Sequence, residues 1–170
     1  QCGSNGVPLE TPLVVGEQSA SVGDLLRQAQ ADIRTDQEAP WTLMAFATYL
    51  PDNETWKASD GEEWNLSRVI EMELDADLHS SACGGSHSLY GLAIAVNKYR
   101  GRHSELNDVL PAPWDKAQEI ITNSIDLSHA ITDRIEQLND QNKDNGIEII
   151  IQEDTASTME DNINQIINLA

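Results

Sequence analysis

The sequence predicts a mainly α-helical protein, a bundle of about six helices with an extended N-terminal segment and at most one short strand pair. Apolar residues recur at steps of three and four along most of the chain, which is the spacing of an amphipathic helix. Capping sequences precede several of these stretches. A chain of 170 residues, 39% of them hydrophobic, suits one core. We therefore divide it into an extended leader, residues 1–20, and a single helical domain, residues 21–170.

The first helix begins after a proline- and glycine-containing leader. Pro8 and Pro12 keep the leader extended, and residues 12–16 contain a short apolar run that suits a strand. Ser21 is followed three residues later by Asp24, the pattern of a capping box. We expect this helix to end near Thr35.

Prolines delimit the second helix. Pro40 suits the first turn of a helix, and Pro51 disfavours helix in the residue before it. Its expected buried side comprises Trp41, Met44, Ala45, Thr48 and Tyr49. Trp56 and Trp64 flank the turn-rich stretch that follows. We expect them to pin this loop to the core, with stacking on a bound ligand as the alternative.

Two further helices are separated by Gly84-Gly85, because each glycine costs about 1 kcal/mol in a helix interior. Asn65 or Ser67 caps the third helix, and Ser86 caps the fourth. The expected core positions are Leu66, Val69, Ile70 and Leu74, then Leu89, Leu92, Ala93 and Val96. Glu71, Glu73 and Asp75 are expected to face water. Gly91 and Ala95 are small enough to admit a neighbouring helix, and Gly101 is the expected stop.

The longest periodic stretch predicts a fifth helix over residues 113–138. Residues 147–152 are rich in isoleucine and suggest a strand pairing with residues 13–15, or a helical turn forced by packing. A capping box at residues 157–160 and an isoleucine stripe predict a last helix.

The charge balance excludes some classes of partner. Ten Lys and Arg against 29 Asp and Glu give a formal charge of −19. Nucleic acids and anionic membranes both require concentrated positive charge, so neither is an expected partner. The acidic balance favours solubility, cations or a basic partner. The sequence has no apolar run long enough for a transmembrane segment.

The N-terminus suggests export. Cys2-Gly3-Ser4-Asn5-Gly6 resembles the start of a bacterial lipoprotein after its lipid-modified cysteine, although here Gln1 precedes Cys2. We therefore expect a secreted, periplasmic or lipid-anchored bacterial protein with its anchor at Cys2, the alternative being an ordinary tail. A protein or a cell-envelope ligand is the expected partner.

The stretch around Cys83 is the densest group of chemically special residues. A cysteine just before a helix feels the positive end of its dipole, so Cys83 could act as a nucleophile with His87 or His79 as base. His79, Cys83 and His87 also have spacings of four residues, and thiolate with imidazole suits zinc. We favour a structural role over both of these, in which Cys83 is buried beside two glycines that permit a sharp turn.

Several short sequences together carry a resemblance to a known group. They are Trp41-Thr42-Leu43-Met44-Ala45, Trp56-Lys57-Ala58-Ser59-Asp60-Gly61-Glu62 and Ala82-Cys83-Gly84-Gly85-Ser86-His87. In word order they resemble uncharacterised secreted or lipid-anchored proteins of planctomycete bacteria. That group is similar to the α/α-toroid scaffolds of prenyltransferases and terpene cyclases. The resemblance covers roughly residues 25–135, implies a partial α/α toroid as the alternative to a bundle, and carries over no activity.

These observations predict an exported helical binding module of unknown ligand. The first alternative is a hydrolase or transferase that uses Cys83 and His87, so whether the chain is an enzyme stays open. The second is a zinc-binding helical domain that uses His79, Cys83 and His87. We expect no cofactor, with zinc as the alternative, and assign Trp56 and Trp64 to ligand binding if a ligand is present.

Overall fold

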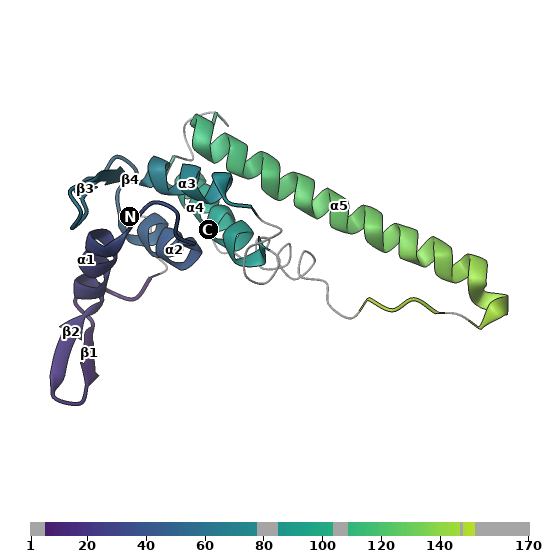
Figure 1. Cartoon of the computed structure of the whole chain (residues 1–170), viewed down its shortest axis with the longest axis horizontal. Coiled ribbons are helices and arrows are strands. Elements are labelled where there is room, and N and C mark those ends of the chain that lie inside the picture. The colour runs from purple at the N-terminus through teal and green to yellow at the C-terminus, as the bar shows by residue number, and fades with distance from the viewer. Residues whose placement is uncertain (1–5, 78–84, 104–108, 147, 152–170) are drawn as a thin grey trace.

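The computed structural model of the chain describes residues 6–77, 85–103, 109–146 and 148–151. Five α-helices and two small antiparallel sheets make up the regular structure of these residues, which confirms the prediction of a mainly helical protein. Figure 1 shows a body formed by the first four helices, from which the fifth helix projects. The prediction of at most one strand pair is wrong, because both sheets lie in stretches where turns bring short segments together.

The first sheet joins the leader to the first helix. Strands β1 (Pro12–Val15) and β2 (Gln18–Ser21) pair antiparallel, with Val15 opposite Gln18. The connection is tight because Gly16 adopts a φ of 62°, a left-handed conformation that favours glycine. Thus the partner of residues 13–15 is the adjacent segment, and the pairing predicted with residues 147–152 is wrong.

Helix α1 (Val22–Asp32) begins as its sequence predicts. The Ser21 hydroxyl accepts a hydrogen bond from the Asp24 N–H at 3.1 Å, and the Asp24 carboxylate accepts one from the Ser21 N–H at 2.7 Å. These bonds satisfy two of the free N–H groups of the first turn. The Ser21 hydroxyl also donates to the Asp24 carboxylate at 2.7 Å, and this bond is the largest of the causes that hold the pKa of Asp24 below its usual range.

Helices α2 (Pro40–Tyr49) and α4 (Ser86–Arg102) form the most extensive helix contact of the body. Gly91 allows their close approach, as the sequence predicts: a Cβ at this position would lie 3.0 Å from the Pro40 carbonyl oxygen. The expected buried side of α2 is wrong. Leu43, Phe46 and Ala47 are fully buried, whereas the Trp41 side chain is 63% exposed.

Strands β3 (Thr55–Lys57) and β4 (Glu63–Asn65) form the second sheet and lead directly into helix α3 (Leu66–Asp75). The Asn65 side chain caps α3 by accepting the Arg68 N–H at 2.8 Å. The expectation that Glu73 faces water is wrong, since this residue is only 2% exposed. Glu71 and Asp75 on the same helix are exposed as predicted.

The start of α4 differs from the prediction in its cap. The N-cap residue is Gly85, with a φ of 80°, and no side chain caps this terminus. A left-handed conformation at this point explains a glycine here. His79 and Cys83 lie outside the described residues, as do the segment 157–169 and Cys2.

One hydrophobic core connects the helices. It combines α1, α2, α3, α4 and the near end of α5 (Ala112–Asn142). Its largest fully buried apolar side chains are those of Trp64, Phe46, Ile33, Leu43, Leu66, Ile70, Leu92, Val69 and Val96. No helix among the described residues combines the length and the apolar character that crossing a membrane requires.

Helix α5 is longer than predicted and continues well past the body (Figure 1). Trp114, Ala117 and Ile121 are buried against the body, and Ile125 packs beside them. Beyond the helix, the short 3₁₀ turn η2 (Lys143–Asn145) reverses the chain at Gly146. The side chain of Asn139 then holds Ile149, accepting its N–H at 2.7 Å and donating to its C=O at 2.9 Å.

Candidate functional site

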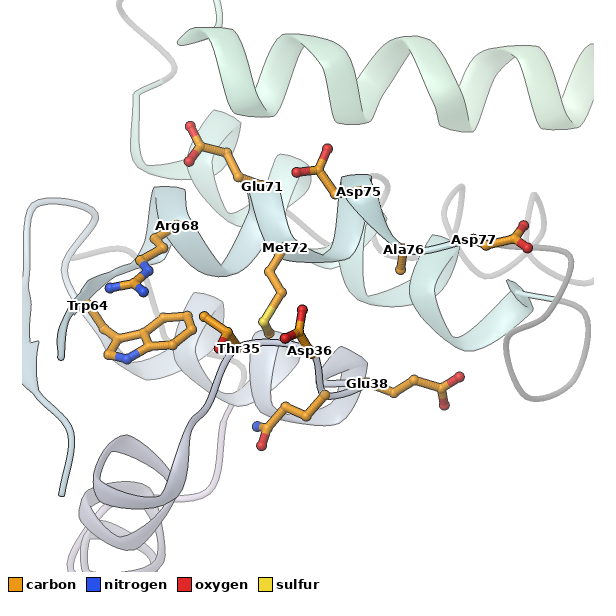
Figure 2. A pocket seen from close by; sticks show the side chains of 11 residues that line it. Thr35, Asp36, Glu38, Trp64, Arg68, Glu71, Met72, Asp75, Ala76 and Asp77 are labelled. Atoms are coloured by element: carbon orange, nitrogen blue, oxygen red, sulfur yellow. The ribbon is translucent and has the colours of Figure 1, made fainter. Parts of the chain in front are cut away.

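One hollow of the described surface is an open groove between α3 and the segment that links α1 to α2. Its volume is ≈ 480 Å³. The residues that line it are Thr35, Asp36, Gln37, Glu38, Trp64, Arg68, Glu71, Met72, Asp75, Ala76 and Asp77. Figure 2 shows the lining side chains: Met72 points from α3 toward Thr35 and Asp36 of the linking segment, whereas Glu71 and Asp75 point away from that segment. We call this hollow the acidic groove.

Five carboxylates line the acidic groove, and all five residues are exposed. They are Asp36, Glu38, Glu71, Asp75 and Asp77. Asp36 adopts a φ of 63°, a left-handed backbone conformation uncommon outside glycine. The helical wall presents Glu71 and Asp75 four residues apart, on the same face of α3. The groove and its border therefore carry exposed negative charge, which attracts positively charged groups.

At one end of the groove, an arginine of the chain itself lies over a buried aromatic ring. The Arg68 guanidinium carbon lies 4.1 Å from the centroid of the Trp64 ring, within the range of a cation–π contact. Arg68 also pairs with Glu62 at 3.2 Å and donates to the Glu63 carbonyl oxygen. Among the described lining residues, Arg68 is the one lysine or arginine, and these contacts already engage it.

Glu73 lies in the core beside this groove, on the same helix. Its Oε1 accepts the N–H of Ala39, the N-cap residue of α2, at 2.6 Å. Burial raises the pKa of Glu73, and the charge of Glu38 raises it further; the bonds from Ala39 and the Ser88 hydroxyl act in the opposite direction. Its Oε2 has no hydrogen-bond partner in the described part of the chain. Glu73 thus supplies the cap that α2 lacks locally, and burial favours its protonated form.

A second charged cluster closes the opposite end of α2. The Arg102 guanidinium donates to Asp52 at 2.6 Å and to the Ala47 carbonyl oxygen at 2.5 Å. Asp52 also lies 2.9 Å from Nε2 of His103. Arg102 therefore satisfies a free carbonyl at the end of a helix, where positive charge is favourable. This arrangement explains Asp52, Arg102 and His103 as structural residues.

The two tryptophans predicted to bind a ligand lie opposite each other. Trp56 and Trp64 are paired across β3 and β4. Trp64 is 1% exposed, and Trp56 packs edge-on against Phe46 with ring centroids 4.9 Å apart. These contacts confirm the packing interpretation. Both tryptophans also line a smaller hollow of ≈ 340 Å³ at the hairpin, and their role in ligand binding stays a prediction.

The candidate catalytic and zinc residues are only partly placed. His87 stands in the first turn of α4, its ring centroid 5.1 Å from that of the exposed Trp41. Because Cys83 and His79 lie outside the described residues, neither the Cys83–His87 pair nor the three-residue zinc set is tested. Within the described ranges, no three His, Cys, Asp or Glu side chains are grouped so that they could hold a metal ion.

Sequence reasoning missed the acidic groove because its two walls come from separate stretches, residues 35–38 and 64–77. The local signal was present in the carboxylates of α3, which the periodicity places on the exposed side. The chain matches no protein-family model, no curated protein and no solved structure.

Proposed function

We propose that the protein is a helical binding module that captures a basic segment of a partner protein in the acidic groove. The observation that carries this proposal is the set of five exposed acidic residues that line or border one hollow. Lysine and arginine side chains of a partner complement such a surface. The net charge of −19 adds a long-range attraction toward the same partners.

The groove suits arginine in particular. A planar guanidinium pairs with carboxylates through two parallel hydrogen bonds. The Trp64 ring is buried and already carries Arg68, so the arginine of a partner would bind through the carboxylates. Met72 adds a flexible apolar contact for the stem of a long side chain.

Titration with an arginine-rich peptide tests this proposal. We expect binding that weakens by about tenfold when Glu71→Gln and Asp75→Asn are combined, because two charge pairs are lost. The matched control is Asp126→Asn with Asp133→Asn, which removes the same charge from exposed positions of α5. Equal weakening by both pairs, or no binding by the unchanged chain, contradicts the proposal.

The proposal also includes the location of the protein and the arrangement of its helices. An extracytoplasmic module anchored at Cys2 would meet its partner at the cell envelope. A sixth helix formed by residues 157–169 would complete the expected bundle, with the partial α/α toroid as the alternative arrangement. Mass analysis of the protein from its native membrane fraction tests the anchor, since a diacylated Cys2 adds the mass of its lipid.

A further inference from the structure

The projecting part of α5 carries an apolar face that is distinct from its contact with the body. Leu127 is 62% exposed and Ile131 is 50% exposed. Ile135 and Leu138 continue the same face at steps of four and three residues. We call these four residues the distal apolar face. At roughly 100° per residue, this face is turned about a quarter of a circle from the body-facing stripe of Trp114, Ala117 and Ile121.

The charges of α5 are segregated away from this face. Its acidic residues include a series at intervals of seven, Glu119, Asp126, Asp133 and Asp140. Seven residues make about two turns, so the four carboxylates form one line along the helix, on the side opposite the distal apolar face. The residues that flank this face are Ser124, Ser128, Arg134 and Gln141, none of them acidic.

Such a neutral face is notable in a chain with 29 acidic residues and 10 basic ones. Two copies of a strongly anionic protein repel each other unless the surfaces that meet lack carboxylates. The distal apolar face meets this condition, and large exposed side chains on it lose contact with water when they pair.

We propose that the distal apolar face binds the same face of a second copy of this chain, with the two α5 helices antiparallel. The face is self-complementary about its centre. Leu127 of one copy meets Leu138 of the other, and Ile131 meets Ile135, as a two-fold interface requires. Antiparallel pairing also places the two anionic bodies at opposite ends, whereas parallel pairing would bring them together.

The half of the distal apolar face nearer the body is open, whereas Ile135 and Leu138 are half-buried. Ile149 is held by Asn139, which lies on the side of α5 next to the distal apolar face. Leu127 and Ile131 lie about three and two turns closer to the body than Asn139 and are exposed. Their exposure leaves the centre of the proposed contact available to a partner helix.

Sedimentation equilibrium of the full chain over about a hundredfold range of concentration tests the proposal. We expect a monomer–dimer equilibrium whose Kd rises about tenfold or more with Ile131→Asp. Asp133→Asn is the matched control on the opposite side of α5 and is expected to leave the dimer intact. Added salt should strengthen the association, because it screens repulsion between the bodies and leaves apolar contact in place. A monomer at every concentration, or a dimer that Ile131→Asp does not weaken, overturns the proposal.

Cross-linking tests the direction of the pairing. Leu127→Cys and Leu138→Cys are made as separate variants in a chain with Cys2→Ser and Cys83→Ser. Oxidation of the mixed variants should give a covalent dimer that neither variant gives alone. Cross-linking of each variant with itself indicates parallel helices and overturns the antiparallel arrangement.

Discussion

The guanidinium of Arg68 lies 4.1 Å from the centre of the Trp64 ring, at one end of the acidic groove. Trp64 is fully buried in the core. Arg68 extends from it to the surface, where it forms an ion pair with Glu62. The pair therefore connects the hydrophobic core to the acidic groove. Arg68 also places a positive charge at the position where the proposed ligand would place a basic side chain.

Replacing Arg68 by glutamine should have opposite effects on stability and binding. The free energy of unfolding falls by about 0.5–1 kcal/mol, because the cation–π contact is lost at a partly exposed site. Binding of an arginine-rich peptide becomes tighter, because repulsion is removed from the groove. Urea unfolding and calorimetric titration measure the two effects, and weaker binding without unfolding would count against the groove as a cation site.

Glu73 should make stability depend on pH. At low pH the carboxyl is protonated in both the folded and unfolded states. As pH rises, the unfolded state ionises first, because burial raises the pKa in the folded state. The free energy of unfolding contributed by this group therefore falls as pH rises through the raised pKa.

Comparison of Glu73→Gln with Glu71→Gln isolates this effect. Glutamine keeps an oxygen for the Ala39 N–H but cannot ionise. The variant should therefore lose part of the fall in stability that occurs as pH rises above the usual pKa of a glutamate. The exposed Glu71 is the control on the same helix. Urea unfolding at several pH values is the measurement, and an unchanged slope in Glu73→Gln would refute the assignment.

Arg102 should contribute more to stability than its neighbour Arg100. Arg102→Ala removes the donor to the Ala47 carbonyl and leaves Asp52 without its nearest cation. We expect a loss of about 1–3 kcal/mol in the free energy of unfolding. Arg100→Ala, at an exposed position of the same helix, is the control and should cost less than about 0.5 kcal/mol. Equal losses in thermal or urea unfolding would show that the cap contributes nothing specific.

Two glycines of α4 should respond in opposite directions to alanine. A Cβ at Gly91 would lie 3.0 Å from the Pro40 oxygen, so Gly91→Ala must push α2 and α4 apart and should cost about 1–3 kcal/mol. A Cβ at Gly101 meets nothing within 4 Å, so Gly101→Ala should stabilise the helix by up to about 1 kcal/mol. Thermal unfolding of both variants measures these changes in stability. A Gly91→Ala variant with unchanged stability would contradict the close packing of α2 and α4.

The sequence predicted those parts of the fold that depend on neighbouring residues. The capping box at Ser21, the proline limits of α2 and the long periodic stretch of α5 all act within a few residues of the chain. Gly91 was also predicted as a point where another helix approaches closely, because a small residue on an apolar face leaves room for a neighbouring backbone.

The features that depend on distant residues were not predictable in this way. Trp41 is exposed and Glu73 is buried because packing between helices, rather than local composition, decides which side of each faces the core. Glu73 is accommodated by an N–H group 34 residues earlier in the chain. The acidic groove likewise exists only once residues 35–38 lie beside α3. The stretch around Cys83, which the sequence favoured for chemistry, lies outside the described residues and stays a prediction.

Backbone amide shifts during titration with an arginine-rich peptide test the proposed function most directly. Binding in the acidic groove should move the signals of residues 35–38 and 68–77, while those of Asp126, Asp133 and Asp140 on α5 stay in place. Glu71→Gln with Asp75→Asn should reduce these shifts at the same peptide concentration. Shifts spread over all acidic surfaces, or concentrated on α5, would contradict the account.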